Sequence, residues 1–524
     1  MSDLIKEIAR RRTFAIISHP DAGKTTLTEK LLLYTGAIDM AGSVRAKKEQ
    51  RKARSDWMEL EKQRGISITS TVMQFGYEGY VMNLLDTPGH EDFSEDTYRT
   101  LTAVDSAVML IDAAKGIEPQ TRKLFDVCRM RGIPIFTFIN KMDRPAREPL
   151  DLMDEIEKTF KIKTFPMNWP LGNGGTFKGV YDRMNKTMNL FETTVHGATV
   201  APVIETTPDG EECAKLVDKT THETFLEEME LLDMVGDSFD EGELSRGELT
   251  PVYFGSAVTN FGVRLFLDSF VSLAPPPAAH ESSEGTVEPS DKDFTGFVFK
   301  IQANMDPKHR DSVAFLRVCS GEFEKDMQVF HSRQKSKIRL SRPHKLFARD
   351  RDTVESAYPG DILGLINPGV FAIGDTVSTG RKVEFGGIPR FAPEHFALLR
   401  CPDPSDSKKF RAGVEQLAAE GATQVFYPDD PNAVRDPILA VVGMLQFDVI
   451  KYRLESEYNV KTILEPMNVK FVRWLETGVD NINLALGAKT VVDSIGRKAV
   501  MFDGDWALRH VIEKNPGIKL TEVK

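Results

Sequence analysis

The fold is decided near the amino terminus by the stretch TFAIISHPDAGKTT, residues 13–26. Its first part, residues 13–18, is a run of β-branched and apolar side chains, which predicts a buried strand. The segment from Lys24 to Tyr34 has the length of a helix and opens with a pair of threonines after its lysine. A short loop that ends in Gly-Lys-Thr joins the two. A strand, such a loop and a helix in direct succession indicate a P-loop, whose backbone amides bind phosphate.

The loop departs from the P-loop pattern at one position. The pattern is Gly-x4-Gly-Lys-Ser/Thr, and Ser18 stands where the first glycine is usual. Amides near Gly23 would hold a β-phosphate at the helix N-terminus, where peptide dipoles favour negative charge. Lys24 would reach the β- and γ-phosphate oxygens, and the Thr25 hydroxyl would bind Mg²⁺. The motif alone also arises by chance. The predicted loop consists of Ser18, His19, Pro20, Asp21, Ala22, Gly23, Lys24 and Thr25.

Further apolar runs extend this pattern along the chain. They are residues 80–85 (YVMNLL), 107–111 (AVMLI), 133–139 (IPIFTFI) and, after a long gap, 251–254 (PVYF). The runs are continuous rather than alternating, and helical patterns separate them. Together they predict a parallel sheet that is covered by helices on both faces.

A second motif follows the run at 80–85 and comprises Asp86, Thr87, Pro88, Gly89 and His90. A carboxylate at this strand end can hold Mg²⁺ through water, and the N–H of Gly89 can meet a γ-phosphate oxygen. The same residues would also suit an ordinary turn. Their position, about 60 residues after the lysine of the loop, favours the metal role.

A third motif, Asn140, Lys141, Met142 and Asp143, follows the run at 133–139 and indicates which base is bound. The Asp143 carboxylate can accept hydrogen bonds from guanine N1–H and the 2-amino group. Adenine offers neither donor, and a site of this kind rejects the wrong ligand by roughly 10⁴-fold. Lys141 would lie along the purine face, and Asn140 would brace the phosphate loop.

A fourth motif comes after residues 251–254, where the amides of Ser256 and Ala257 would lie near guanine O6. Each motif is weak alone. Four motifs in the right order, each at the end of a predicted strand, make coincidence improbable. The sequence therefore predicts a site for GTP and GDP with Mg²⁺.

Two further residues are expected to act at the terminal phosphate. Ser67, in the run RGISI at 64–68, would join the Mg²⁺ shell only when a γ-phosphate is present and would then order residues 37–70. The alternative is an ordinary entry into a strand. His90 is expected to orient the attacking water and stabilise charge, as phosphoryl transfer requires. Its alternative is a surface or core histidine.

The rest of the chain predicts a multidomain α/β protein. We expect a P-loop GTPase domain at 1–280 with a subdomain inserted at about 145–250. A linker rich in Ser and Glu begins at 274 and extends to about 291. Closely spaced strands and glycine turns then predict an antiparallel β-barrel domain at 281–390. The order strand, helix, strand, helix, strand predicts an α+β sandwich domain at 391–524, to which the less legible tail 468–524 is assigned.

Composition excludes some classes of protein. The net charge of −11 argues against a general nucleic-acid coat, although residues 45–54 and 331–351 are locally basic and are read as solvated faces or polyanion contacts. No run approaches the roughly 18 uncharged apolar residues of a membrane span. The four cysteines lack metal-ligand spacing and are expected to be reduced thiols in a cytoplasmic protein: Cys128, Cys213, Cys319 and Cys401.

The motifs SHPDAGKTT, RGISI, DTPGH, NKMD and GSA together resemble those of translational GTPases. The runs GFVFKI and FLRVCSGEF are similar to the second domain of elongation factor G. LAAEGATQVF and VVGMLQFDVIKYRLESEYNV are similar to its third domain. Elongation factor G has two further domains that this sequence does not contain. The combination most resembles the bacterial class-II release factors, and the resemblance covers nearly the whole chain.

This resemblance implies a role in translation termination. The GTP form would bind the ribosome, promote departure of the class-I release factor, hydrolyse GTP and leave. Ribosomal RNA of the large subunit would activate His90, and the inserted subdomain would contact the ribosomal stalk proteins. A monomer without a membrane anchor is expected. Two residues depart from the family pattern: Ser67 stands where most relatives have Thr, and Pro20 replaces a branched apolar residue, which puts a hydrophobic gate beside His90 in doubt.

Two alternatives stay open at this point. One is a different translational GTPase, translocase-like or acting in ribosome stress, which the missing C-terminal domains disfavour. The other is a binding module in which the nucleotide is structural and is not turned over.

Overall fold

The structure is a computed structural model of the whole chain. It describes residues 3–36, 70–191, 203–235, 238–303, 312–341, 343–344, 354–367, 369–386, 388, 392–430, 434–476 and 482–522. Ser67 and the basic run 45–54 therefore lie outside the described residues.

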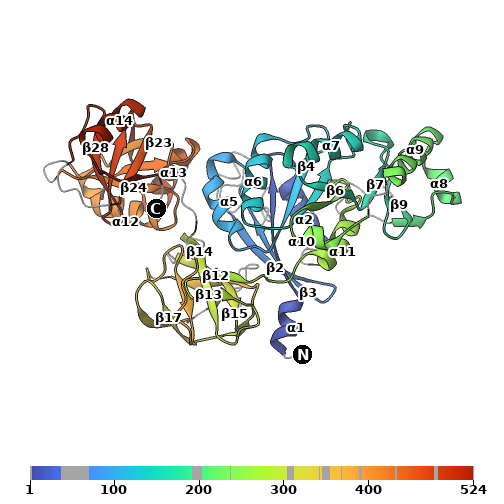
Figure 1. Cartoon of the computed structure of the whole chain (residues 1–524), viewed down its shortest axis with the longest axis horizontal. Helices are drawn as coiled ribbons and strands as arrows, with labels where there is room; N and C mark the ends of the chain where they lie inside the picture. The colour runs from blue at the N-terminus through green and yellow to red at the C-terminus, as the bar shows by residue number, and fades with distance from the viewer. Residues whose placement is uncertain are drawn as a thin grey trace.

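The GTPase domain is built on a seven-stranded sheet in the order β2-β3-β1-β4-β5-β11-β6 (Figure 1). All neighbours pair in parallel except β2 and β3, which are antiparallel. The predicted parallel sheet is confirmed, with β2 as an added antiparallel edge. The strands are β1 (Arg11–Ser18), β2 (Thr71–Tyr77), β3 (Tyr80–Asp86), β4 (Ser106–Asp112), β5 (Ile135–Asn140), β6 (Lys163–Pro166) and β11 (Leu249–Phe254).

Helices cover both faces of this sheet because β1 is apolar on each side. Phe14 and Ile16 belong to a core with α2 and α11, whereas Ala15 and Ile17 belong to a core with α5, α6 and α7. Successive side chains of a strand point to opposite faces, so a strand buried on both faces reads as one apolar run. The helices are α1 (Asp3–Ala9), α2 (Lys24–Tyr34), α5 (Ser94–Leu101), α6 (Pro119–Met130), α7 (Pro149–Phe160), α10 (Glu241–Ser245) and α11 (Val263–Leu273).

An inserted subdomain extends the GTPase domain at the end farthest from the C-terminal residues (Figure 1). It is a four-stranded antiparallel sheet in the order β10-β9-β8-β7, with two helices. The early part of residues 145–250 forms α7 and β6 and belongs to the parent sheet, so the separate sheet begins only at Asn168. Its elements are β7 (Asn168–Leu171), β8 (Gly179–Asp182), β9 (Thr187–Phe191), β10 (Val203–Thr206), α8 (Glu211–Leu216) and α9 (Lys219–Val235).

The stretch expected to be a linker is in part a hairpin of β12 (His280–Ser282) and β13 (Gly285–Val287), which corrects that prediction. Val287 is buried, and the His280 ring contacts the rings of Phe297 and Phe385. The Ser- and Glu-rich composition suggested solvation, but the burial of Val287 and the ring contacts of the half-buried His280 give this segment a fixed place against the barrel.

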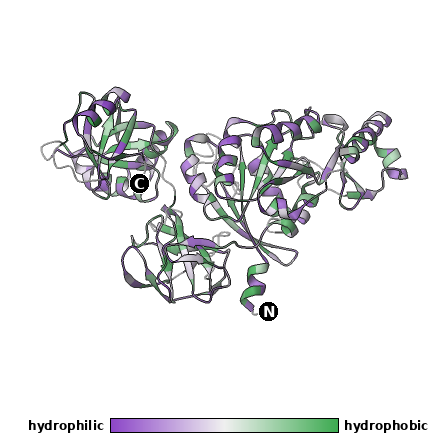
Figure 2. Ribbon diagram, in the orientation of Figure 1, coloured by the Kyte–Doolittle hydropathy of each residue, from purple (hydrophilic) through white to green (hydrophobic). Residues whose placement is uncertain are grey.

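The barrel domain is an antiparallel sheet in the order β18-β17-β22-β14-β15-β21-β19, with β16 and β20 paired separately. Its apolar side chains form a hydrophobic core, and stretches of its strands are coloured as hydrophobic in Figure 2. Part of the basic run 331–351 is not a solvated face: His331 is buried beside Asp375, and Arg333 binds the same carboxylate. The strands are β14 (Thr295–Ala303), β15 (Ser312–Ser320), β16 (Phe323–Glu324), β17 (Gln328–His331), β18 (Ser336–Arg339), β19 (Pro343–His344), β20 (Ser356–Ala357), β21 (Ile362–Ile366) and β22 (Thr376–Ser378).

The C-terminal domain is one eight-stranded sheet in the order β26-β23-β25-β24-β28-β29-β27-β30. Helices α12 and α13 cover part of it, and the tail beyond residue 468 adds four strands and α14 to the same sheet. The elements are β23 (His395–Arg400), α12 (Ser407–Ala419), β24 (Gln424–Pro428), β25 (Ile438–Val441), α13 (Leu445–Tyr458), β26 (Ile463–Pro466), β27 (Phe471–Leu475), β28 (Ala488–Asp493), β29 (Lys498–Phe502), α14 (Asp505–Lys514) and β30 (Leu520–Thr521).

All four cysteines are free thiols, as expected. Among the described residues, no helix combines the length and the apolar character of a bilayer crossing.

Candidate functional site

The loop between β1 and α2 packs closely against the end of β5. Gly23 has a φ of +103°, which favours glycine, and a Cβ built there would lie 2.3 Å from Asn140 Nδ2. Helix α2 begins at Lys24, and its N-cap residue is Gly23, which has no side chain with which to cap the helix. Its first amides therefore keep their hydrogen-bonding capacity at the loop.

The predicted Asp86 lies at this loop, as the strand order requires. Strands β1 and β3 pair in parallel, with Ile16 opposite Asp86. Lys24 Nζ lies 2.5 Å from Asp86 Oδ1, and both side chains are buried. The Thr87 hydroxyl donates to the Ile16 carbonyl at 2.8 Å. Charge neutralisation by Lys24 allows the Asp86 carboxylate to be buried here.

The opening residues of the loop carry buried polar atoms. The hydroxyl of Ser18 and Nδ1 of His19 have no hydrogen-bond partner among the described residues. The other ring nitrogen of His19 lies 3.3 Å from Glu118 Oε1, and its backbone N–H donates to Thr121 Oγ1 at 3.1 Å. Buried polar groups normally have partners, so two such atoms in one loop suit a loop that meets a polar ligand.

Asn140 joins the loop to the segment after β11. Its Nδ2 donates to the Ala22 carbonyl at 2.8 Å, which is the bracing that the sequence predicts. Its Oδ1 accepts from the N–H of Ala257 at 2.8 Å. One side chain thus links three strand ends that are distant in the sequence.

The two residues of the fourth motif have a different geometry from the one predicted. The Ser256 N–H donates to the Phe261 carbonyl at 2.9 Å, and the Ala257 N–H is used by Asn140. The motif acts on the third motif through a side chain, since Ser256 Oγ donates to Asp143 Oδ1 at 2.6 Å. Both amides were expected to donate to guanine O6. In this arrangement each already donates to an acceptor within the chain, so neither is oriented toward a base.

Lys141 and Met142 have separate roles in the geometry. Met142 is fully buried, and its N–H donates to the Gly255 carbonyl at 3.2 Å. Lys141 Nζ lies 2.7 Å from Asp112 Oδ2 and 2.5 Å from the Asp21 carbonyl. Burial raises the pKa of Asp112, but hydrogen bonds from Lys141 and from backbone amides outweigh it, so this pKa lies below its usual value.

Sequence reasoning missed Asp112. It ends β4, whose register places it opposite Asn140. The available signal was an aspartate at the end of an apolar run, which is the same signal that singled out Asp86.

His90 follows Gly89 at the same edge of the sheet. A Cβ on Gly89 would lie 3.7 Å from the Cα of Pro20, so the second motif packs on the loop. His90 is 34% exposed, and its Nδ1 accepts from the backbone N–H of Asp92 at 3.2 Å. Since Nδ1 accepts, the neutral ring carries its proton on Nε2.

The structure thus gathers the first, second, third and fourth motifs at the carboxyl edge of one parallel sheet, while Ser67 lies outside the described residues. Within the described ranges, no cluster of three or more His, Cys, Asp or Glu side chains forms a metal site.

Three protein-family models match consecutive parts of the chain. Residues 9–276 match the elongation factor Tu GTP binding domain, and residues 293–380 match elongation factor G domain 2. Residues 385–512 match the class II release factor RF3, C-terminal domain. The fold, the site and the first two matches define a translational GTPase.

Relatives cover the chain almost completely. Peptide chain release factor 3 of Gloeobacter violaceus is 59% identical over 99% of this chain and 98% of its own. That of Synechococcus elongatus is 56% identical, over 100% and 95%. A crystal structure from Thermus thermophilus shares the fold with a TM-score of 0.70, at 23% identity, over 93% of this chain and 72% of that one. The chain belongs to the peptide chain release factor 3 family, whose members are GTPases of translation termination.

Proposed function

We propose that the loop from Ser18 to Thr25 binds the phosphates of GTP and GDP. The uncapped amides of α2, the left-handed Gly23 and the neighbouring Lys24 support this assignment. Lys24 would exchange its contact with Asp86 for the β- and γ-phosphates. The Thr25 hydroxyl and the Asp86 carboxylate are hard oxygen donors that suit Mg²⁺.

Magnesium, when bound, would neutralise charge on the phosphates. Ser67 would add a hydroxyl to its shell in the triphosphate state. Thr87 and Pro88 would fix the end of β3, and the Gly89 N–H would meet the γ-phosphate. The bond from Thr87 to the Ile16 carbonyl supports that fixed position.

We propose that Asp143 selects guanine, because its carboxylate is held by Ser256 and can accept from N1–H and the 2-amino group. Ser256 then acts as a positioning residue, and Ala257 orients Asn140. Lys141, anchored by Asp112, would support the purine face. Met142 is buried, and its packing would fix the position of the segment from Asn140 to Asp143.

We propose that His90 orients the attacking water, with the ribosomal RNA of the large subunit completing its position. The exposure of the ring, together with a proton on Nε2, supports an activation from outside the chain. Turnover without ribosomes would then be slow.

In the cell we propose a cytoplasmic monomer that binds the ribosome after peptide release and promotes dissociation and recycling of class-I release factors. The inserted subdomain would meet the stalk proteins. We also propose domain boundaries near residues 280 and 390, since one matched family model gives way to the next close to each position. The single observation that carries the proposal is that Asn140 ties the phosphate loop to the base-binding segments.

Hydrolysis of GTP with and without ribosomes tests this proposal. Ribosomes should raise kcat by several orders of magnitude, and His90→Ala should remove most of that gain, because a water-orienting group is lost. GTP affinity should be unchanged in the variant. A protein whose nucleotide is structural would show neither stimulation nor an effect of His90→Ala.

The place in translation needs a second assay. Post-termination ribosomes that carry a labelled class-I factor should lose it when the protein and GTP are added. Movement of tRNA without loss of the factor would favour a translocase-like GTPase instead.

Base selection is tested by Asp143→Asn. An amide offers guanine a donor where an acceptor is needed, so GTP affinity should fall by about 10²-fold or more, and xanthosine triphosphate should bind better than GTP. Competition binding of the two nucleotides measures this. Equal GTP affinity in both proteins would contradict the assignment.

A further inference from the structure

Asp92 joins the proposed catalytic histidine to the C-terminal domain. It lies two residues after His90, in the short 3-10 helix Glu91–Phe93. Its Oδ2 accepts from the N–H of Leu445 at 2.7 Å, and Leu445 is the first residue of α13. The two residues are 353 positions apart in the sequence.

The contact is a helix cap supplied by another domain. The N-cap position of α13 is Met444, whose side chain makes no cap hydrogen bond. Gln446 uses its side-chain oxygen on the amides of Val442 and Gly443, which precede the helix. The Asp92 carboxylate therefore serves a first-turn amide of α13, where negative charge is also favoured by the helix dipole.

Gly443 makes this approach sterically available. A Cβ at residue 443 would lie 2.2 Å from Asp92 Cγ and 2.5 Å from Asp92 Cα. The φ of Gly443 is not in the left-handed region, so its backbone conformation does not require glycine. The close approach of Asp92 requires it instead.

The other side of Asp92 faces His90. Its backbone N–H donates to His90 Nδ1 at 3.2 Å, and its Oδ1 lies 3.7 Å from the same nitrogen. One residue thus holds the ring nitrogen with its amide and the C-terminal domain with its carboxylate.

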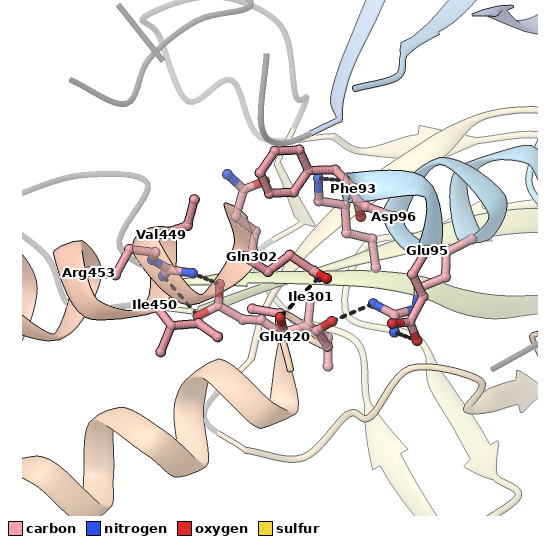
Figure 3. Close-up of a pocket in the computed structure, with 14 residues that line it drawn as sticks. Phe93, Glu95, Asp96, Ile301, Gln302, Glu420, Val449, Ile450 and Arg453 are labelled. Carbon is pink, nitrogen blue, oxygen red and sulfur yellow. Dashed lines mark hydrogen bonds and ion pairs between the residues drawn. The ribbon is translucent and has the colours of Figure 1, made fainter. Parts of the chain in front are cut away.

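A cavity and a further hydrogen bond lie beside the Asp92 contact. The cavity, of about 70 Å³, is lined by Phe93 and by residues of α5, β14 and α13 (Figure 3). Across it, Arg99 donates to the Gly421 carbonyl at 3.1 Å. On the far side, Arg453 is bound to Glu420 within the C-terminal domain. The described interface is therefore hollow beside the Asp92 contact, and its lining mixes charged side chains with apolar ones such as Phe93, Val449 and Ile450.

We propose that Asp92 is a positioning residue through which the placement of the C-terminal domain sets the position of His90. When α13 holds the carboxylate, the Asp92 amide keeps Nδ1 as an acceptor and Nε2 as the donor. When the domain turns away, this restraint on the ring is released. The inference rests on the proposed role of His90 in hydrolysis.

The test compares ribosome-stimulated GTP hydrolysis by full-length variants. Asp92→Ala and Gly443→Ala should each lower kcat by about tenfold or more, with KM for GTP within about twofold, because misplacement of a catalytic group affects the chemical step. Asp92→Asn keeps a capping oxygen and should retain most of the activity. Asp240→Ala, which removes an aspartate cap from α10 at 2.9 Å from the Glu243 amide, is the matched control and should have no effect.

A wild-type kcat in both Asp92→Ala and Gly443→Ala would overturn the proposal, as would an Asn variant as impaired as the Ala variant. The free protein provides a readout that does not depend on ribosomes. The ¹⁵N signals of the His90 ring, assigned with His90→Ala, should shift in Gly443→Ala and stay constant in Asp240→Ala. If ribosomes fail to stimulate wild-type protein, the proposed function fails, and an unshifted ring in Gly443→Ala separately overturns the positioning role.

Discussion

Against the barrel, the GTPase domain buries a shared apolar cluster and ion pairs, whereas against the C-terminal domain it makes hydrogen bonds beside a partly apolar cavity. One hydrophobic cluster contains residues of both the GTPase domain and the barrel, including Phe297 and Phe315. The Arg317–Asp105 pair, at 2.6 Å, is 1% exposed on each side. Arg11 pairs with Asp361 at 2.8 Å across the same interface.

The hydrophobic clusters of the C-terminal domain contain its own residues alone within the described chain. Its contact with the GTPase domain includes the hydrogen bonds of Asp92 and Arg99 and encloses a cavity. Apolar burial stabilises one fixed arrangement, because separation would expose it to water. Polar contacts exchange readily for water, so their net contribution is small and the arrangement can change. This difference supports the proposal that the placement of the C-terminal domain, rather than that of the barrel, acts on His90.

Asp105→Ala should have the strongest effect on stability. It leaves Arg317 buried without a carboxylate, and breaking a buried pair in this way costs about 3–5 kcal/mol. Hydrogen exchange of the amides in β15 measures the loss of stability. The double variant Asp105→Leu/Arg317→Met should recover most of it, because both charges are gone. A loss below about 1 kcal/mol in the single variant would mean that this interface is no firmer than the other.

The second largest expected effect is a pH dependence of the stability of this same interface between the GTPase domain and the barrel. His280 Nε2 is buried without a partner among the described residues, and burial, followed by the charge of Arg317, lowers the pKa of His280 to about 4. The unfolded chain takes up this proton near pH 6.5 and the folded chain only near pH 4, so stability falls as pH falls between these values. The loss should reach roughly 2–3 kcal/mol at pH 4.

Denaturation of wild-type protein and of His280→Phe at several pH values measures this contribution. The phenyl ring keeps the contacts with Phe297 and Phe385 and does not titrate. The difference in stability between the two proteins should therefore grow below pH 6.5. If the difference in stability did not change with pH, His280 would not be the source of a pH dependence at this interface.

Asp92→Ala should affect stability least, although it is the same substitution as Asp105→Ala. Loss of a capping carboxylate costs about 1 kcal/mol, and no buried charge is left behind. Hydrogen exchange in the first turn of α13 should report this modest loss, while kcat falls as described above. A stability loss equal to that of Asp105→Ala would erase the distinction between the two interfaces.

Local patterns in the sequence were enough to single out the motifs of the proposed nucleotide site and to order the elements of the domains. Helix α2 runs from Lys24 to Tyr34 as predicted, and the apolar runs became strands β1, β3, β4, β5 and β11. These features are local, since continuous apolar runs and a loop before a helix are set by near neighbours. The contact of Asn140 with the loop could be predicted because parallel strands end at the same edge.

Features that depend on distant partners emerged only from the packing of the folded chain. The β12–β13 hairpin is stabilised by rings from the barrel, and the amides of Ser256 and Ala257 find internal acceptors. Asp112 and Asp92 acquire their roles from Lys141 and Leu445, which no spacing rule associates with them. The sequence tells that an aspartate carries a negative charge. Which group it pairs with is decided only when the sheets and domains pack together.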